Sequence, residues 1–195
     1  MGVNIMGFAT SIKTNDLTEI AKKINIKISE KFGSWTLEQA MSDIQADELC
    51  FIKTENGAII LVGDAFPIME TKLRPLSENE NKVLRFMYGE TSMVFLFEYQ
   101  ENGKVLRIKS VYNYETNAEK GKTLEIEFSG IEIEEVIAEL IQKVSGDNIF
   151  ALELDYKVQR YRYLGKVENK ESLSTTNIEN QINHYTSKKP WWKFW

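Results

Sequence analysis

An Asn-Gly dipeptide between two apolar runs is the feature that most constrains how this chain can fold, and it occurs twice. Asn56-Gly57 stands between the apolar runs 48–54 and 58–64. Such a dipeptide favours a tight type I′ turn, because both central residues of that turn need a positive φ. The pattern therefore predicts an antiparallel hairpin in this part of the chain.

A second hairpin is predicted at Asn102-Gly103, which separates residues 91–100 from 104–112. In the first of these runs, large apolar side chains occupy both alternating sets of positions. Met93, Phe95, Phe97 and Tyr99 share one face, and Val94 and Leu96 share the other. A strand that is apolar on both faces is typical of a sheet covered on both sides.

Other strands are predicted from shorter apolar runs, at residues 3–12, 82–88, 122–128 and 148–163. Helical spacing is also present in 82–88, but the segment is short and aromatic, which favours a strand. In 148–163 the alternation changes phase toward the end. This change predicts a bulge near Gln159–Arg160, because a shift of one residue moves every side chain to the opposite face.

Three helices are predicted from apolar residues spaced three and four apart. The first follows a cap at Asn15 or Asp16, and the second begins at Thr36, which forms a capping box with Gln39. The third, 130–145, takes Ser129 as its N-cap and Glu132 as the other half of a capping box, with Phe128 and Ile133 packed across its start. Its buried face is expected to be Ile133, Val136, Ile137, Leu140, Ile141 and Val144, and Gly146 is expected to end it.

These elements define an α+β fold, in which a mostly antiparallel sheet with two Asn-Gly hairpins packs against two or three helices. The expected organisation is a single domain over residues 1–165, a polar and flexible linker over 166–187, and a tryptophan-rich docking motif over 188–195. The linker is predicted from its richness in Asn, Ser, Thr, Glu and Lys, which leaves little to bury.

The residues that most often carry catalysis or bind metals are scarce. The chain has one cysteine and one histidine. Cys50 lies in an apolar run and is expected to be a buried reduced thiol, while His184 lies in the C-terminal tail. Gly121-Lys122-Thr123 lacks the upstream glycine of a phosphate-binding loop, because residue 116 is threonine. We therefore expect no enzyme activity, metal or cofactor.

Charge is concentrated between Asn113 and Glu139, where eight acids and two lysines give a local net charge of −6. The acids are Glu115, Glu119, Glu125, Glu127, Glu132, Glu134, Glu135 and Glu139. Such a run is either a solvated surface or an acidic patch that orients a basic partner. The patch interpretation assigns partner binding to Glu132, Glu135 and Glu139.

The net charge of −5 argues against nucleic acid as the main partner. Arg160-Tyr161-Arg162-Tyr163 interleaves basic and aromatic residues, a pattern that could serve single-stranded nucleic acid. The preferred interpretation is an alternating strand with the tyrosines inward and the arginines outward.

The C-terminus places three of the four tryptophans in the final five positions. Three interpretations stay open: the motif folds back on its own domain, docks into a partner protein, or contacts a membrane surface. Protein docking assigns the contact to Trp191, Trp192, Phe194 and Trp195. Membrane contact adds anionic lipid as the partner and assigns Lys188, Lys189, Trp191, Trp192, Lys193 and Trp195.

One stretch resembles a known kind of protein. From Gly57 to Tyr112 a strand is followed by Leu76-Ser77, Phe86-Met87-Tyr88, Glu90-Thr91-Ser92, Phe97-Glu98-Tyr99 and Asn102-Gly103-Lys104. This order resembles small bacterial α+β proteins found as immunity proteins beside polymorphic toxins. The resemblance implies a cytoplasmic, single-domain inhibitor that binds a toxin domain by surface complementarity.

The sequence therefore favours a non-catalytic bacterial protein-binding module, with toxin neutralisation as its specific form. The alternative is an adaptor at the inner face of the membrane, or in a larger assembly, held by residues 188–195. A cytoplasmic location is expected in the first case and a peripheral membrane location in the second.

Overall fold

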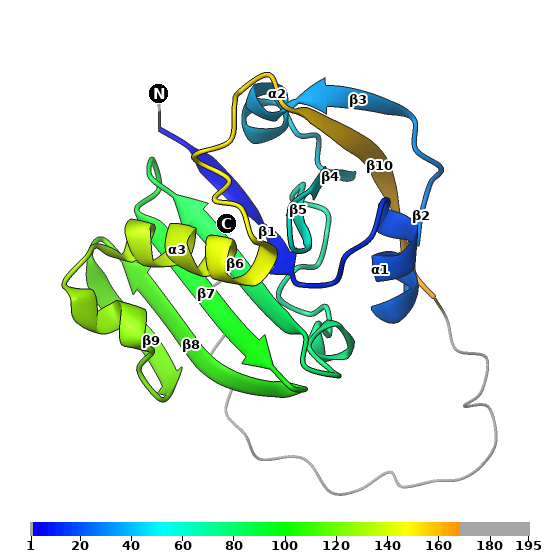
Figure 1. Cartoon of the computed structure of the whole chain (residues 1–195). Coiled ribbons are helices and arrows are strands. Elements are labelled where there is room, and N and C mark those ends of the chain that lie inside the picture. The colour runs from blue at the N-terminus through cyan, green and yellow to red at the C-terminus, as the bar shows by residue number, and fades with distance from the viewer. Residues whose placement is uncertain (1, 168–195) are drawn as a thin grey trace, which may run out of the picture.

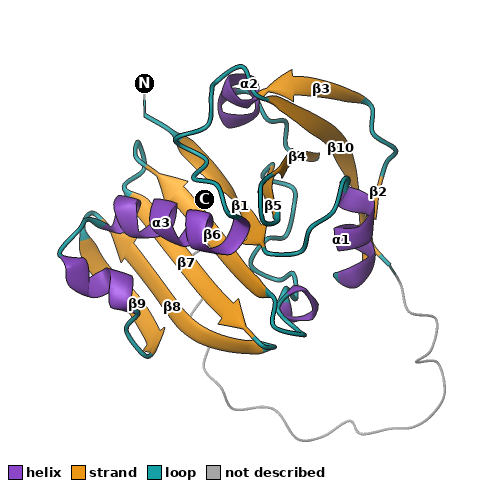
Figure 2. Ribbon diagram, viewed as in Figure 1, coloured by secondary structure: helices purple, strands orange, loops and turns teal. Residues whose placement is uncertain are grey.

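The structure, a computed structural model, describes residues 2–167 and is built on one large antiparallel sheet (Figures 1 and 2). Its strands are β1 (Asn4–Thr10), β2 (Ile26–Ile28), β3 (Gly33–Thr36), β4 (Glu48–Lys53), β5 (Ala58–Val62), β6 (Lys82–Gly89), β7 (Val94–Glu101), β8 (Lys104–Tyr112), β9 (Glu115–Gly121) and β10 (Lys157–Lys166). The helices are α1 (Leu17–Lys23), α2 (Leu37–Ser42) and α3 (Ile133–Ser145), with short 3₁₀ helices η1 (Arg74–Leu76) and η2 (Glu125–Ser129). An antiparallel sheet with three α-helices in this part of the chain confirms the α+β class.

The order of the strands brings the two ends of the described chain into the interior of the sheet. It runs β2-β10-β4-β5-β1-β6-β7-β8-β9, and β3 also pairs with β10. The first strand, β1, therefore lies between β5 and β6. The last strand, β10, lies between β4 on one side and β2 and β3 on the other.

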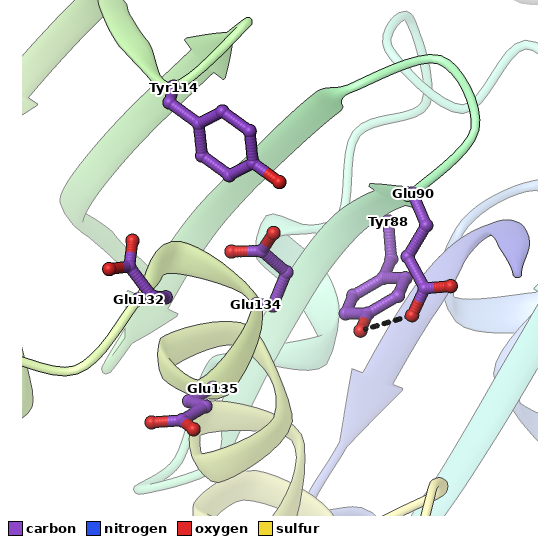
Figure 3. A pocket seen from close by; sticks show the side chains of 6 residues that line it. All are labelled: Tyr88, Glu90, Tyr114, Glu132, Glu134 and Glu135. Carbon is purple, nitrogen blue, oxygen red and sulfur yellow. Dashed lines mark hydrogen bonds between the residues drawn. The ribbon is translucent and has the colours of Figure 1, made fainter. Parts of the chain in front are cut away.

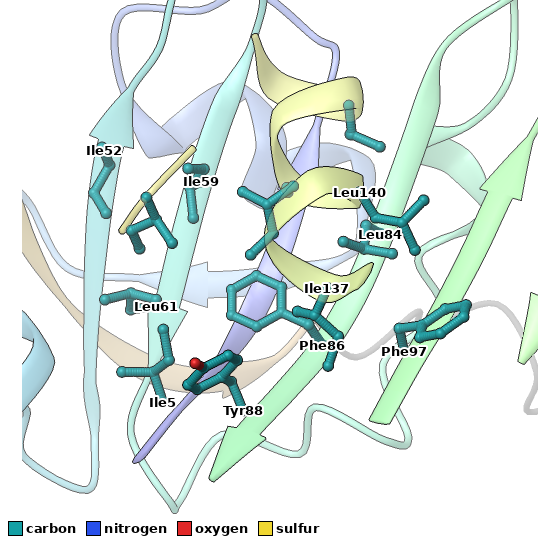
Figure 4. Packing of buried hydrophobic residues seen from close by; sticks show 14 of the residues in the cluster. Ile5, Ile52, Ile59, Leu61, Leu84, Phe86, Tyr88, Phe97, Ile137 and Leu140 are labelled. Carbon is teal, nitrogen blue, oxygen red and sulfur yellow. The ribbon is translucent and has the colours of Figure 1, made fainter. Parts of the chain in front are cut away.

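Two apolar cores cover opposite faces of the sheet. One core joins α2 and α3 to the sheet, and Figure 4 shows Ile137 and Leu140 of α3 above Leu84 and Phe86 of β6. The other core joins α1 and η1 to side chains such as Phe8. All six residues predicted for the buried face of α3 are buried, which confirms that pattern.

Several local predictions are confirmed. The Asp16 carboxylate accepts the Thr18 N–H at 2.7 Å and caps α1. Thr36 and Gln39 form the reciprocal capping box of α2, with bonds of 3.3 and 3.1 Å. Residues 82–89 form the strand β6.

The two Asn-Gly connections differ in backbone geometry. Asn102 and Gly103 join β7 to β8 with φ values of 51° and 70°. Neither Asn56 nor Gly57 has a positive φ, so the prediction of a type I′ turn is wrong there. Asn56 instead donates its backbone N–H to Ser145 O at 2.9 Å, and a Cβ on Gly57 would lie 1.9 Å from Thr10 O. Tertiary contacts therefore decide this turn.

The predicted start of the third helix is wrong. Residues 122–128 are not a strand, because η2 occupies residues 125–129, and α3 begins after Glu132, not after Ser129. Phe128 is 75% exposed and packs across no helix start. The reason is a contact distant in sequence: Glu127 bonds the backbone N–H of Leu124 and the side chain of Arg107 on β8, which holds η2 in place.

The predicted strand 148–163 is too long at its start. Residues 148–156 form successive turns, since the Asn148 side chain accepts the Phe150 N–H at 3.0 Å and its carbonyl accepts the Ala151 N–H. No bulge occurs at Gln159–Arg160, which pair in register with β3 and β4. The irregularity lies between Tyr163 and Gly165, where Gly165 adopts a φ of 111° that favours glycine.

Candidate functional site

An open hollow with an acidic lining lies at the N-terminal end of α3 (Figure 3). Its volume is about 730 Å³. Three elements that are distant in sequence supply its side chains: the end of β6 with the turn after it, the turn between β8 and β9, and the start of α3. The lining residues are Tyr88, Glu90, Tyr114, Glu132, Glu134 and Glu135.

The start of α3 is an electrostatically favourable place for three of these acids. Glu132 is the N-cap residue, and Glu134 and Glu135 lie in the first turn. Carboxylates are stabilised there by the positive end of the helix dipole. The Oε2 atom of Glu134 is buried and has no hydrogen-bond partner. Figure 3 shows Glu134 between Tyr114 and Tyr88, so its carboxylate lies at the middle of the group.

Glu90 is held in place by two hydrogen bonds. It accepts the Tyr88 hydroxyl at 3.1 Å and the Val3 N–H at 3.0 Å. Burial raises the pKa of Tyr88, and the bond to Glu90 raises it further, so this phenol stays protonated and donates. Tyr114 is 58% exposed and offers its ring to solvent at the mouth of the hollow.

Basic side chains do not neutralise this group. None of the ion pairs formed within residues 2–167 includes Glu90, Glu132, Glu134 or Glu135. Four carboxylates and two tyrosines therefore face one opening. The arrangement can attract a cationic surface, and its aromatic rings can pack against that surface.

The predicted acidic patch is divided by the fold. Glu132 and Glu135 line the hollow, and Glu139 is exposed farther along the same helix but does not line it. Glu127 and Glu119 are instead bound to Arg107, at 2.9 and 2.7 Å. These two acids, Glu119 on β9 and Glu127 on η2, are thus paired with Arg107 and do not line the hollow.

The ion pair between Arg107 and Glu127 shifts the pKa of both groups. The hydrogen bond to Glu127 raises the pKa of Arg107 above its usual value. Burial opposes ionisation of Glu127, but hydrogen bonds from Arg107, the Leu124 N–H and Lys109 outweigh it, and the pKa of Glu127 is lowered. Both groups are therefore charged in the folded protein at neutral pH.

Sequence reasoning missed Tyr88, Glu90 and Tyr114 as members of the site, and it counted Glu134 among the acids of the region without assigning it to partner binding. Glu90 directly follows β6, and Tyr114 lies in the two-residue turn after β8. Their position beside predicted strand ends was the available sign of a site, because the turns that follow alternate strands of an antiparallel sheet lie at the same end of that sheet. The fold was needed to show that this end of the sheet adjoins the start of α3.

Two other predicted features have structural roles. Cys50 is a buried free thiol in β4, as predicted, and burial raises its pKa to about 12, with a further rise from Glu48. Tyr161 is buried as predicted, but Arg160 is not a simple outward side chain. It bonds Glu48 at 2.5 Å, and its guanidinium lies 3.6 Å from the centre of the Trp35 ring.

The aromatic and basic residues predicted for docking or membrane contact, Lys188, Lys189, Trp191, Trp192, Lys193, Phe194 and Trp195, lie outside the described residues. No helix in the segment 2–167 is long and apolar enough to cross a membrane. Within that segment, no group of three or more His, Cys, Asp or Glu side chains could hold a metal ion.

No protein-family model, curated protein or solved structure matches this chain. The acidic hollow itself is therefore the basis for a functional proposal.

Proposed function

We propose that this protein is a non-catalytic module that binds a basic surface of another protein through the acidic hollow at the start of α3. One observation carries the proposal: four carboxylates and two tyrosines from three distant segments line one open hollow, and no ion pair of residues 2–167 neutralises the carboxylates. Long-range attraction between such a surface and a cationic partner accelerates and orients association.

The hollow also has the composition of a binding surface. Tyrosine is frequent among the residues that dominate interface energies, because it combines a large apolar ring with a polar hydroxyl. Tyr114 is exposed at the mouth, whereas Tyr88 is anchored by Glu90. We propose that Tyr114 packs against the partner while Glu132 and Glu135 meet its lysine or arginine side chains.

The specific form of the proposal is a bacterial, cytoplasmic immunity protein that neutralises a basic toxin domain. It is supported by the resemblance of residues 57–112 to that kind of protein and by the acidic character of the hollow. A toxin domain that acts on nucleic acid or membranes carries basic residues for that purpose, and an acidic surface can cover them.

The test compares matched charge variants of the full chain. The triple variant Glu132→Gln, Glu135→Gln and Glu139→Gln removes three exposed charges from α3. Its control, Glu19→Gln, Glu30→Gln and Glu38→Gln, removes three exposed charges from α1, the β2–β3 connection and α2. Wild type and both variants are used to capture proteins from native lysate, together with a chain that stops at Ser187.

The expected result is a partner that binds wild type, the control and the shortened chain, but binds the α3 variant weakly. With the purified partner at low salt, the α3 variant should associate about ten times more slowly or worse. Its association rate should also depend less on salt than that of wild type. Equal rates for the two triple variants would refute the acidic hollow as the binding surface.

The immunity role is tested separately. Expression of the captured partner alone should stop bacterial growth, and co-expression of wild type should restore it. A partner that is harmless on its own would exclude toxin neutralisation while leaving the binding surface intact.

A further inference from the structure

We propose that a second surface, an apolar groove at the gap between the start of β1 and the chain that leaves β5, receives the C-terminal residues 188–195 of the same chain. The groove has a volume of about 650 Å³, within the range of about 300–1,000 Å³ that is usual for ligand sites. It lies between the start of β1, the end of β6 and the segment 64–70 that follows β5, and Ala40 of α2 and Ile44 also line it. Nothing in the acidic hollow contributes to it except Tyr88, which borders both.

The groove exists because the first residues of β1 do not pair with β5. β1 pairs with β6 from Asn4 to Thr10, but its pairing with β5 begins only at Gly7. Along residues 4–6, the β5 side of β1 therefore has no partner among the described strands. The chain leaves β5 at Val62 and forms the opposite wall of the groove through Phe66, Ile68 and Met69.

A buried arginine fixes that wall. Arg85 of β6 is 6% exposed, donates to Thr71 O at 2.6 Å and to Met69 O at 3.4 Å, and pairs with Glu98 at 3.0 Å. These bonds hold the segment 69–71 against the sheet. The wall is thus preformed, which lowers the ordering cost of binding.

The lining is suited to large aromatic side chains. It is mostly apolar and includes the half-buried methionines Met6, Met69 and Met87. Methionine is flexible and polarisable, and it makes favourable contacts with aromatic rings of different shapes. Residues 188–195 contain three tryptophans and one phenylalanine, which need such a surface to leave water.

The place where the described residues stop, and the charge of the rim, point to the occupant. Lys166, one residue before the last described residue, lies 3.9 Å from Glu70, which lines the groove. The 20 residues from 168 to 187 can span up to about 70 Å, so they reach any part of the groove from there. The exposed rim acids Asp64 and Glu70 complement Lys188, Lys189 and Lys193.

Tethering makes this contact favourable even if it is weak. A site and a ligand joined by a short linker meet at an effective concentration in the millimolar range. A segment with a dissociation constant of about 0.1 mM would then be docked roughly nine-tenths of the time.

The first test places a photoreactive benzoyl-phenylalanine at position 192 of the full chain and identifies the cross-linked peptides by mass spectrometry. Cross-links within the monomer to peptides that contain Met6, Met69 or Met87 are expected. Cross-links to other surfaces, or only between two chains, would overturn the proposal.

The second test measures acrylamide quenching of tryptophan fluorescence, to which the tail contributes three of the four indoles. Met87→Glu, which places a charge in the groove, should increase quenching severalfold. Leu154→Glu, which places the same charge at an exposed apolar position outside the groove, should not. Circular dichroism checks that both variants are folded. If Met87→Glu does not fold, the cross-linking test alone decides the proposal.

Membrane contact is the competing destination of residues 188–195. If the tryptophans of the wild-type chain are fully quenched without lipid, and quenching falls only when phosphatidylserine vesicles are added, the groove is overturned as the docking site. Protection of the indoles in the absence of lipid supports it.

Discussion

Replacing Glu127 by glutamine should destabilise the fold far more than replacing any glutamate of the acidic hollow. The Glu127 carboxylate is 2% exposed and accepts four hydrogen bonds: two from Arg107 at 2.9 Å, one from Leu124 N at 2.9 Å and one from Lys109 at 3.3 Å. Breaking a buried ion pair on one side costs about 3–5 kcal/mol, because the other charge stays buried. Glu119, half-exposed, still contacts Arg107, so we expect the lower end, about 3 kcal/mol.

A loss of that size lowers the melting temperature by roughly 6–12 °C for a chain of this length. Urea unfolding at pH 7 measures the free energy directly, with Glu125→Gln as the matched control on the same 3₁₀ helix. Glu125 is exposed and forms no ion pair in the described structure, so its variant should stay within about 0.5 kcal/mol of wild type.

The dependence on pH gives an independent check. Because the pKa of Glu127 is lowered by folding, its contribution is present above the unfolded pKa of about 4.3 and is lost as the pH falls through the folded value. The stability gap between wild type and Glu127→Gln should therefore be full at pH 6–7 and shrink below about pH 4. A gap that is absent, or that equals the effect of Glu125→Gln, would refute the structural role of this ion pair.

Two substitutions and one reactivity measurement test the packing. Gly7→Ala should cost about 3 kcal/mol in urea unfolding, because its Cβ would lie 2.0 Å from Ile60 O between two central strands. Leu140→Ala, at a fully buried position on the sheet-facing side of α3, should cost about 2–5 kcal/mol in the same assay. Cys50 should not react with a thiol reagent at pH 8 until the protein is unfolded, since burial raises its pKa to about 12; rapid reaction in the native state would contradict its buried position.

The features that sequence predicts well are those decided within a few residues. The capping box of α2 needs only Thr36 and Gln39, and the buried face of α3 follows from helical spacing. The start of α3 is different. Ser129 fits the pattern of an N-cap, yet the bonds that Glu127 makes to Arg107, 20 residues away, impose a 3₁₀ turn there and delay the helix to Ile133.

The candidate site shows the same division. Helical spacing places Glu132 and Glu135 together on one face of α3, and both line the hollow. A count of acids cannot separate them from Glu127, which is chemically identical but paired inside the fold. Tyr88 and Tyr114 join the site only because β6 and β8 finish at the same end of the sheet. This is a property of strand order and not of local sequence.

The insertion of β10 among the first strands has a consequence for the newly synthesised chain. β2 and β3 join the sheet only through β10, and the residues involved are separated by more than 120 positions. During translation, that half of the sheet stays incomplete until residue 166 has emerged. Until then, the apolar side chains of these strands remain exposed to solvent. Contacts this distant in sequence close slowly, so maturation of the protein should be limited by the arrival of one late strand.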